Sequence, residues 1–174
     1  MNNTIQKIKM TIMTVIVSQI LACQPSEIES HPSMLAEKLI MSTQCSKQSE
    51  GMSVQLYEKS DGLRKKLQVI IGNKTIVDSL MSKIDFKWLS VLQINMGLKR
   101  TGGYALSLLD GSFEIDRGVG SIRLKLDEPD KSSMVTQALT SPCLFVVLPT
   151  GGFDKIKLFN QAGDLLLKQD VRHQ

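Results

Sequence analysis

A glycine-rich segment, Gly97-Leu98-Lys99-Arg100-Thr101-Gly102-Gly103-Tyr104, is the first candidate for chemistry in this sequence. In a phosphate-binding loop of the Walker type, a lysine follows the second glycine and a serine or threonine follows the lysine. Gly103 and Tyr104 occupy those two positions here. The segments on both sides alternate like strands, so we expect no helix N-terminus that would bind a phosphate. These residues therefore argue against nucleotide binding.

Side chains for acid–base catalysis and metal binding are scarce. The 174 residues include two histidines, His31 and His173. A serine or cysteine nucleophile needs a histidine beside it, but His31 lies in a Pro- and Ser-rich segment and His173 is one residue from the C-terminus. No His, Cys and Asp residues have the spacing of a zinc site. We expect a protein that is not an enzyme and that uses no metal and no cofactor.

Residues 1–23 resemble the signal of a bacterial lipoprotein. Lys7 and Lys9 precede an apolar stretch at 10–22, which is too short for a membrane span but has the length of a signal-peptide core. It ends in Ile20-Leu21-Ala22-Cys23, which is similar to the lipobox, where the chain is cut before the cysteine and the cysteine is acylated. The resemblance implies a signal peptide at 1–22, lipid (palmitate) on Cys23, and a periplasm-facing protein of the outer membrane.

That location leads to two further predictions, a tether and a disulfide. Residues 23–34 contain two prolines and no apolar periodicity, so we expect a flexible tether between membrane and domain. If Cys23 carries lipid, Cys45 and Cys143 remain as a pair in an oxidising compartment. The sequence favours a disulfide between them, and two separate buried thiols are the alternative.

The remaining chain, residues 35–172, has the pattern of a single domain. Asn73 is placed to cap a helix, because apolar residues at 76, 77, 80, 81 and 84 then form one stripe. Residues 67–71 fit either a strand or the start of a helix. Elsewhere apolar residues alternate with polar ones, as in strands. Strands are expected at 38–43, 53–57, 88–96, 104–108, 113–115, 122–126, 144–148, 156–158 and 165–167, with turns at Asp61-Gly62 and Asp110-Gly111. We predict a mainly β (α+β) fold, an antiparallel sheet sandwich or open barrel with one covering helix.

The charge balance excludes one class of partner. Lys plus Arg number 21 and Asp plus Glu number 17, a formal charge of +4, of which Lys7 and Lys9 in the signal supply +2. That balance is too weak for a nucleic-acid partner. The cluster Arg64-Lys65-Lys66 has two interpretations, a contact with anionic lipid headgroups or an exposed loop or helix start. The sequence alone favours the second.

The C-terminal half, residues 91–149, resembles the C-terminal domain of the PrcB family of protease-complex subunits. In that family a strand leads into a Thr-Gly-Gly-Tyr signature, and a Gln-containing strand and a proline-started strand follow. This chain has Thr101-Gly102-Gly103-Tyr104 and, later, Met134-Val135-Thr136-Gln137-Ala138-Leu139-Thr140-Ser141-Pro142-Cys143. Cys143 departs from the aromatic residue or histidine that many members have there. The resemblance implies a non-catalytic lipoprotein that binds and stabilises a protease or a similar envelope partner.

Seven residues are candidates for partner binding: Lys99, Arg100, Thr101, Gly102, Gly103, Tyr104 and Gln137. The other interpretation is architectural. Two glycines allow a turn or bulge, Tyr104 packs with its neighbours, and Thr101 and Gln137 bond the backbone between strands. The alternative function is a small-ligand or glycan-binding periplasmic domain that uses the same cleft.

Overall fold

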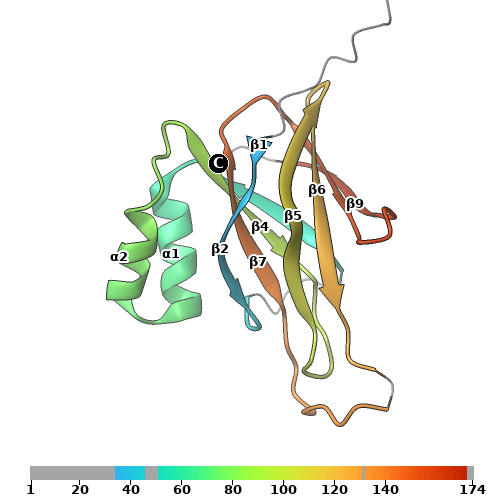
Figure 1. Ribbon diagram of the computed structural model, residues 1–174. Coiled ribbons are helices and arrows are strands. Elements are labelled where there is room, and N and C mark those ends of the chain that lie inside the picture. The colour runs from blue at the N-terminus through green and yellow to red at the C-terminus, as the bar shows by residue number, and fades with distance from the viewer. Residues whose placement is uncertain (1–33, 46–50, 131, 172–174) are drawn as a thin grey trace, which may run out of the picture.

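The protein folds into two β-sheets packed face to face, with two helices as a third layer (Figure 1). The computed structural model describes residues 34–45, 51–130 and 132–171. The two sheets do not close into a barrel. The predicted mainly β fold is therefore confirmed, and of the two forms expected it is the sandwich.

One sheet has five strands in the order β1-β5-β6-β8-β9. Neighbouring strands are antiparallel except β6 and β8, which are parallel. The bounds are β1 Met34–Leu35, β5 Ala105–Asp116, β6 Val119–Asp127, β8 Lys155–Phe159 and β9 Leu165–Asp170.

The other sheet has four antiparallel strands in the order β2-β7-β4-β3. The bounds are β2 Glu37–Ser42, β3 Ser53–Tyr57, β4 Leu89–Asn95 and β7 Cys143–Pro149. β7 is a nearly continuous apolar run and lies inside the sheet, as its composition predicts. Between β1 and β2 the chain passes from one sheet to the other at Ala36, whose N–H donates to the Gly111 carbonyl.

The main core lies between the sheets. Side chains with a period of two point inward, such as Ile122 and Leu124 of β6 and Leu92 and Ile94 of β4. All four are buried. The alternating segments of the sequence therefore become strands because each has one face to bury.

Two helices cover the outer face of the four-stranded sheet, α1 at Ser60–Ile71 and α2 at Lys74–Met81. The Asn73 side chain accepts a hydrogen bond from the Ile76 N–H at 3.2 Å, which confirms the predicted cap. Leu63, Leu67, Val77 and Met81 are buried against the sheet. Among the described residues, no helix lies over the outer face of the five-stranded sheet (Figure 1).

Two local expectations are wrong. A second helix, α1, replaces the turn expected at Asp61-Gly62 and the strand alternative for 67–71. Its stripe of Leu63 and Leu67 has helical spacing, and Asp61 lies in the first turn, where the helix dipole favours an acid.

The other error is the hairpin turn expected at Asp110-Gly111. β5 continues through these residues with an irregular register between Leu108 and Phe113. The turn lies at Arg117-Gly118, both with positive φ, which is typical of a type I′ hairpin.

Candidate functional site

Residues 99–104, which we call the lip, pack against residues 129–130 and 132–140, which we call the facing loop. Lys99 and Thr140 exchange backbone hydrogen bonds, N–H to carbonyl, at 2.8 and 2.9 Å. The Thr140 hydroxyl also donates to the Thr101 carbonyl at 2.9 Å, and the Gly102 N–H donates to the Thr136 carbonyl at 3.0 Å. Residues that are 34 to 41 positions apart in the sequence are therefore hydrogen-bonded in one surface at the end of the sandwich.

The structure explains why glycine occupies both positions 102 and 103 of the lip. A Cβ on Gly102 would lie 2.4 Å from the Thr136 hydroxyl oxygen. Gly103 has φ of +89°, and a Cβ there would lie 3.1 Å from the Pro129 Cβ. Close approach of the facing loop requires the first glycine, and backbone conformation requires the second.

The other predicted site residues divide into packed and exposed groups. Tyr104 is half-buried against the main core, and the Lys99 ammonium lies 4.9 Å from the centroid of its ring. Thr101 is half-buried and contributes its carbonyl, not its side chain, to the described hydrogen bond. Arg100 and Gln137 are exposed. Arg100 in the lip and Gln137 in the facing loop are thus left open to a partner, and the rest of the lip is packed or bonded to the facing loop.

The facing loop also exposes apolar side chains, which sequence reasoning missed. Met134 is fully exposed and Leu139 is 60% exposed. Methionine commonly fills gaps in a core, so the residue type of Met134 gives no sign of this exposure. Its neighbours are serines and a lysine, a composition that signals a surface loop. Exposed apolar patches with a polar rim mark protein contact sites, and these two side chains are the apolar candidates that the facing loop offers.

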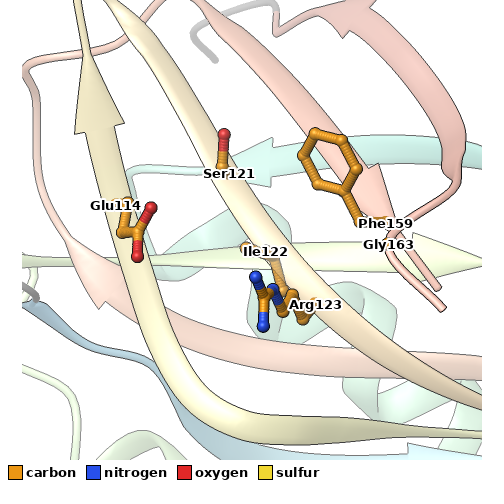
Figure 2. Close-up of a pocket in the computed structure, with 6 residues that line it drawn as sticks. All are labelled: Glu114, Ser121, Ile122, Arg123, Phe159 and Gly163. Atoms are coloured by element: carbon orange, nitrogen blue, oxygen red, sulfur yellow. The ribbon is translucent and has the colours of Figure 1, made fainter. Parts of the chain in front are cut away.

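A pocket of about 260 Å³ lies elsewhere, on the uncovered face of the five-stranded sheet. Figure 2 shows Glu114 of β5, Ser121 and Arg123 of β6, and Phe159 of β8 around it. Arg123 and Phe159 are Cα partners across the parallel pair. Within the described residues neither Arg123 nor Glu114 forms an ion pair, so both charges are open to a ligand. Sequence reasoning missed this pocket because the parallel pairing of β6 with β8 has no local signal.

The buried face of β4 carries a chain of polar groups under the helical layer. The Tyr57 hydroxyl donates to the Gln93 side-chain oxygen at 2.9 Å, and the Gln93 amide donates to the Asn95 side-chain oxygen at 2.6 Å. Tyr57 and Gln93 are both buried. Burial raises the pKa of Tyr57 to about 12 because the phenolate would lose its water. The chain is satisfied within the protein and so stabilises the sheet.

The cysteines predicted to pair do so. Cys45 and Cys143 form a disulfide, with Cα atoms 5.8 Å apart, that joins the end of β2 to the start of β7. Cys23, the predicted lipid attachment site, lies outside the described residues, as do the signal peptide and most of the tether.

The described residues lack both a grouped set of metal ligands and a membrane-spanning helix. In 34–45, 51–130 and 132–171, no three His, Cys, Asp or Glu side chains are grouped so that they could hold a metal ion. Within the same ranges, neither helix has the length and apolar character to cross a membrane.

Comparison with known proteins gives one match. Residues 90–149 match the family described as PrcB C-terminal, which confirms the resemblance seen in the sequence. The matched segment supplies two adjacent strands to each sheet, β5 and β6 to one and β4 and β7 to the other, together with the lip and the facing loop. No curated protein and no solved structure matches the chain significantly. Residues 90–149 are therefore the part of this chain that is similar to the PrcB C-terminal family.

Proposed function

We propose that this protein is a non-catalytic, protein-binding subunit of a protease complex in the bacterial envelope. The observation that carries the proposal is the match of residues 90–149 to the PrcB C-terminal family, which suggests association with a protease. The proposal includes acylation of Cys23 and a position on the periplasmic side of the outer membrane. The lipobox-like sequence that ends at Cys23 supports that anchor.

The lip and the facing loop are the surface that we assign to the partner. Both lie inside the matched segment, and they are held together by three backbone hydrogen bonds. Met134 and Leu139 supply exposed apolar contacts, and Arg100 supplies a charge. A few side chains, with arginine over-represented among them, commonly carry most of the energy of such an interface.

Cross-linking in intact cells tests the partner. A C-terminally tagged full chain is cross-linked and purified, and the co-purifying proteins are identified by mass spectrometry. We expect one stoichiometric envelope protease, which is lost from the double variant Met134→Asp, Leu139→Asp. The matched control is Leu165→Asp on β9, which is 53% exposed and lies outside the assigned surface. Recovery of no protease, or equal loss in the control, would overturn the assignment.

The anchor has its own test. Mass spectrometry of the purified chain should find Cys23 as the acylated N-terminal residue. The Cys23→Ser variant should then leave the membrane fraction or keep its signal peptide. An unmodified Cys23 in the membrane fraction would contradict the lipoprotein assignment without affecting the test of the protease partner.

A small polar ligand, such as a glycan, is the second candidate. The pocket of Glu114, Arg123 and Phe159 favours it, since it offers an unpaired cation, an unpaired anion and an aromatic ring in one place. A thermal-shift screen of glycans and amino acids should raise the unfolding midpoint with ligand concentration if such a ligand binds. Arg123→Ala should abolish that shift, whereas Arg117→Ala, an exposed arginine at the nearby hairpin turn, should not.

A further inference from the structure

The two helices form an open groove on the side of the molecule away from the five-stranded sheet. Its lining residues are Arg64, Lys65, Gln68, Val69 and Lys74, and its volume is about 570 Å³. Lys74 is the first residue of α2, so only the α1–α2 hairpin brings it to the α1 residues. The groove therefore combines three basic side chains from two helices.

Charge is concentrated in this layer. Residues 58–88, which include both helices, contain seven basic and four acidic side chains, a net charge of +3. Arg64 pairs with Asp78 across the hairpin. Lys65 and Lys74 form no ion pair within the described part of the chain. Lys66 of the basic cluster is half-buried and does not line the groove.

Apolar side chains are exposed on the same two helices. Val69, which lines the groove, is 84% exposed, and Ile76 on α2 is 49% exposed. Lysine and arginine stems add aliphatic surface around them. A helical surface with basic residues and exposed apolar side chains is typical of proteins that lie in the membrane interface.

We propose that the α1–α2 groove docks on an anionic phospholipid bilayer, with Lys65 and Lys74 at the headgroups and Val69 at the acyl boundary. The charge of the groove is complementary to anionic lipid, and each lysine near such a surface contributes about fivefold to affinity. The proposal goes beyond the protease association and requires no protein partner. It assigns to the helical layer the function of orienting the domain.

The proposed anchor permits this orientation. Cys23 and Met34 are eleven residues apart, which spans at most about 40 Å. A domain of this size has a diameter of roughly 35–40 Å. The chain from an acylated Cys23 is therefore long enough for the helical layer to reach the bilayer.

Fluorescence of the full-length protein on vesicles tests the docking. Val69→Cys is labelled with an environment-sensitive fluorophore, and the chain is reconstituted with vesicles of phosphatidylcholine alone or of equal parts phosphatidylcholine and phosphatidylglycerol. We expect a blue shift of the emission with phosphatidylglycerol only. The same label on Leu165→Cys, on the opposite layer, should show no shift.

Charge reversal makes the test specific. The double variant Lys65→Glu, Lys74→Glu should abolish the shift of the Val69 label. Its matched control is Lys157→Glu, Lys168→Glu, two paired positions of β8 and β9 that have no ion pair in the described residues. This control should keep the shift. The midpoint of thermal unfolding identifies any variant that fails to fold. If the double variant fails to fold, the emission of the Val69 label is measured with Lys65→Glu or Lys74→Glu alone.

The outcomes are separable. An equal shift with both lipids, no shift with phosphatidylglycerol, or an equal shift in Lys65→Glu, Lys74→Glu would overturn the docking proposal. Binding of an acidic protein by this groove would give no shift with pure vesicles and so also counts against it. Flotation of the chain with phosphatidylcholine vesicles reports the anchor independently, and the protease test uses neither readout.

Discussion

The side-chain amide of Gln169 on β9 makes two hydrogen bonds to the main chain of Val54 on β3. The Val54 N–H donates to the Gln169 side-chain oxygen at 3.2 Å, and the Gln169 amide nitrogen donates to the Val54 carbonyl at 3.1 Å. β3 and β9 are the outer strands of different sheets. The Gln169 side chain therefore pairs the N–H and the carbonyl of an edge strand, as a peptide group of a neighbouring strand would. It also links the two sheets.

Replacing Gln169 should destabilise this edge. Gln169→Leu keeps a similar volume but leaves a part-buried N–H and carbonyl unpaired, which costs about 1–3 kcal/mol. Urea unfolding measures the loss. Gln161→Leu is the matched control, because the Gln161 side chain accepts from the Leu126 N–H at an exposed position, where water replaces it. Equal losses in the two variants would contradict the bridging function of Gln169.

The lip glycine with positive φ should be required for stability. Gly103→Ala forces a non-glycine residue into φ of +89° and brings a Cβ to 3.1 Å from Pro129, so we expect a loss of about 2 kcal/mol. Gly151→Ala is the control, since its φ is +83° with no atom near the added Cβ. Gly151→Ala should lose only the stability that corresponds to holding alanine at a positive φ, about 1 kcal/mol. Thermal and urea unfolding measure both, and an unchanged stability of Gly103→Ala would remove the architectural interpretation of the lip.

Alkaline pH should destabilise the protein through Tyr57. The pKa of Tyr57 is raised to about 12 in the folded state, whereas an unfolded tyrosine ionises near pH 10. Its contribution is therefore complete below pH 10. Between pH 10 and 12 only the unfolded chain releases this proton, so stability falls by about 1.4 kcal/mol per pH unit.

Tyr57→Phe isolates this effect. At pH 7 the variant should be less stable by about 1 kcal/mol, because Gln93 loses its donor. Above pH 10 its stability should fall less steeply than that of the natural chain. Urea unfolding at a series of pH values provides the comparison, and parallel curves for the two proteins would show that Tyr57 is not the group responsible.

Removing the disulfide should be costly. Cys45 and Cys143 are 98 residues apart, and a loop of that length gives a stabilisation of roughly 4.7 kcal/mol by chain entropy. Cys45→Ala, Cys143→Ala should lower the urea midpoint by the corresponding amount. A reducing agent should affect the natural chain and leave the double variant unchanged. If the urea midpoint of the natural chain stays the same after the disulfide has been fully reduced, the prediction is contradicted.

Local periodicity predicted most of the strands. Residues 53–57 and 122–126 alternate cleanly, and both are strands with one buried face. Asn73 predicted the start of α2 because a helix cap depends on a local hydrogen bond, here from the Ile76 N–H three residues along the chain. α1 was missed because Asp61-Gly62 favours a turn and the apolar run of 67–71 fits either element. The strand through Gly111 was missed because its turn-like residues pair with Ala36, far away in sequence.

By itself, the sequence determined the mainly β class, the identity of most strands, the resemblance of the C-terminal half to the PrcB family, and the pair of cysteines available for a disulfide. These follow from patterns within a few residues or from a family signature. Only the tertiary structure decided that β6 pairs with β8, that Gln169 bonds Val54, and that Lys74 lies beside Lys65. Such neighbours depend on how strands and helices pack together across long separations, and no period in the sequence encodes that packing.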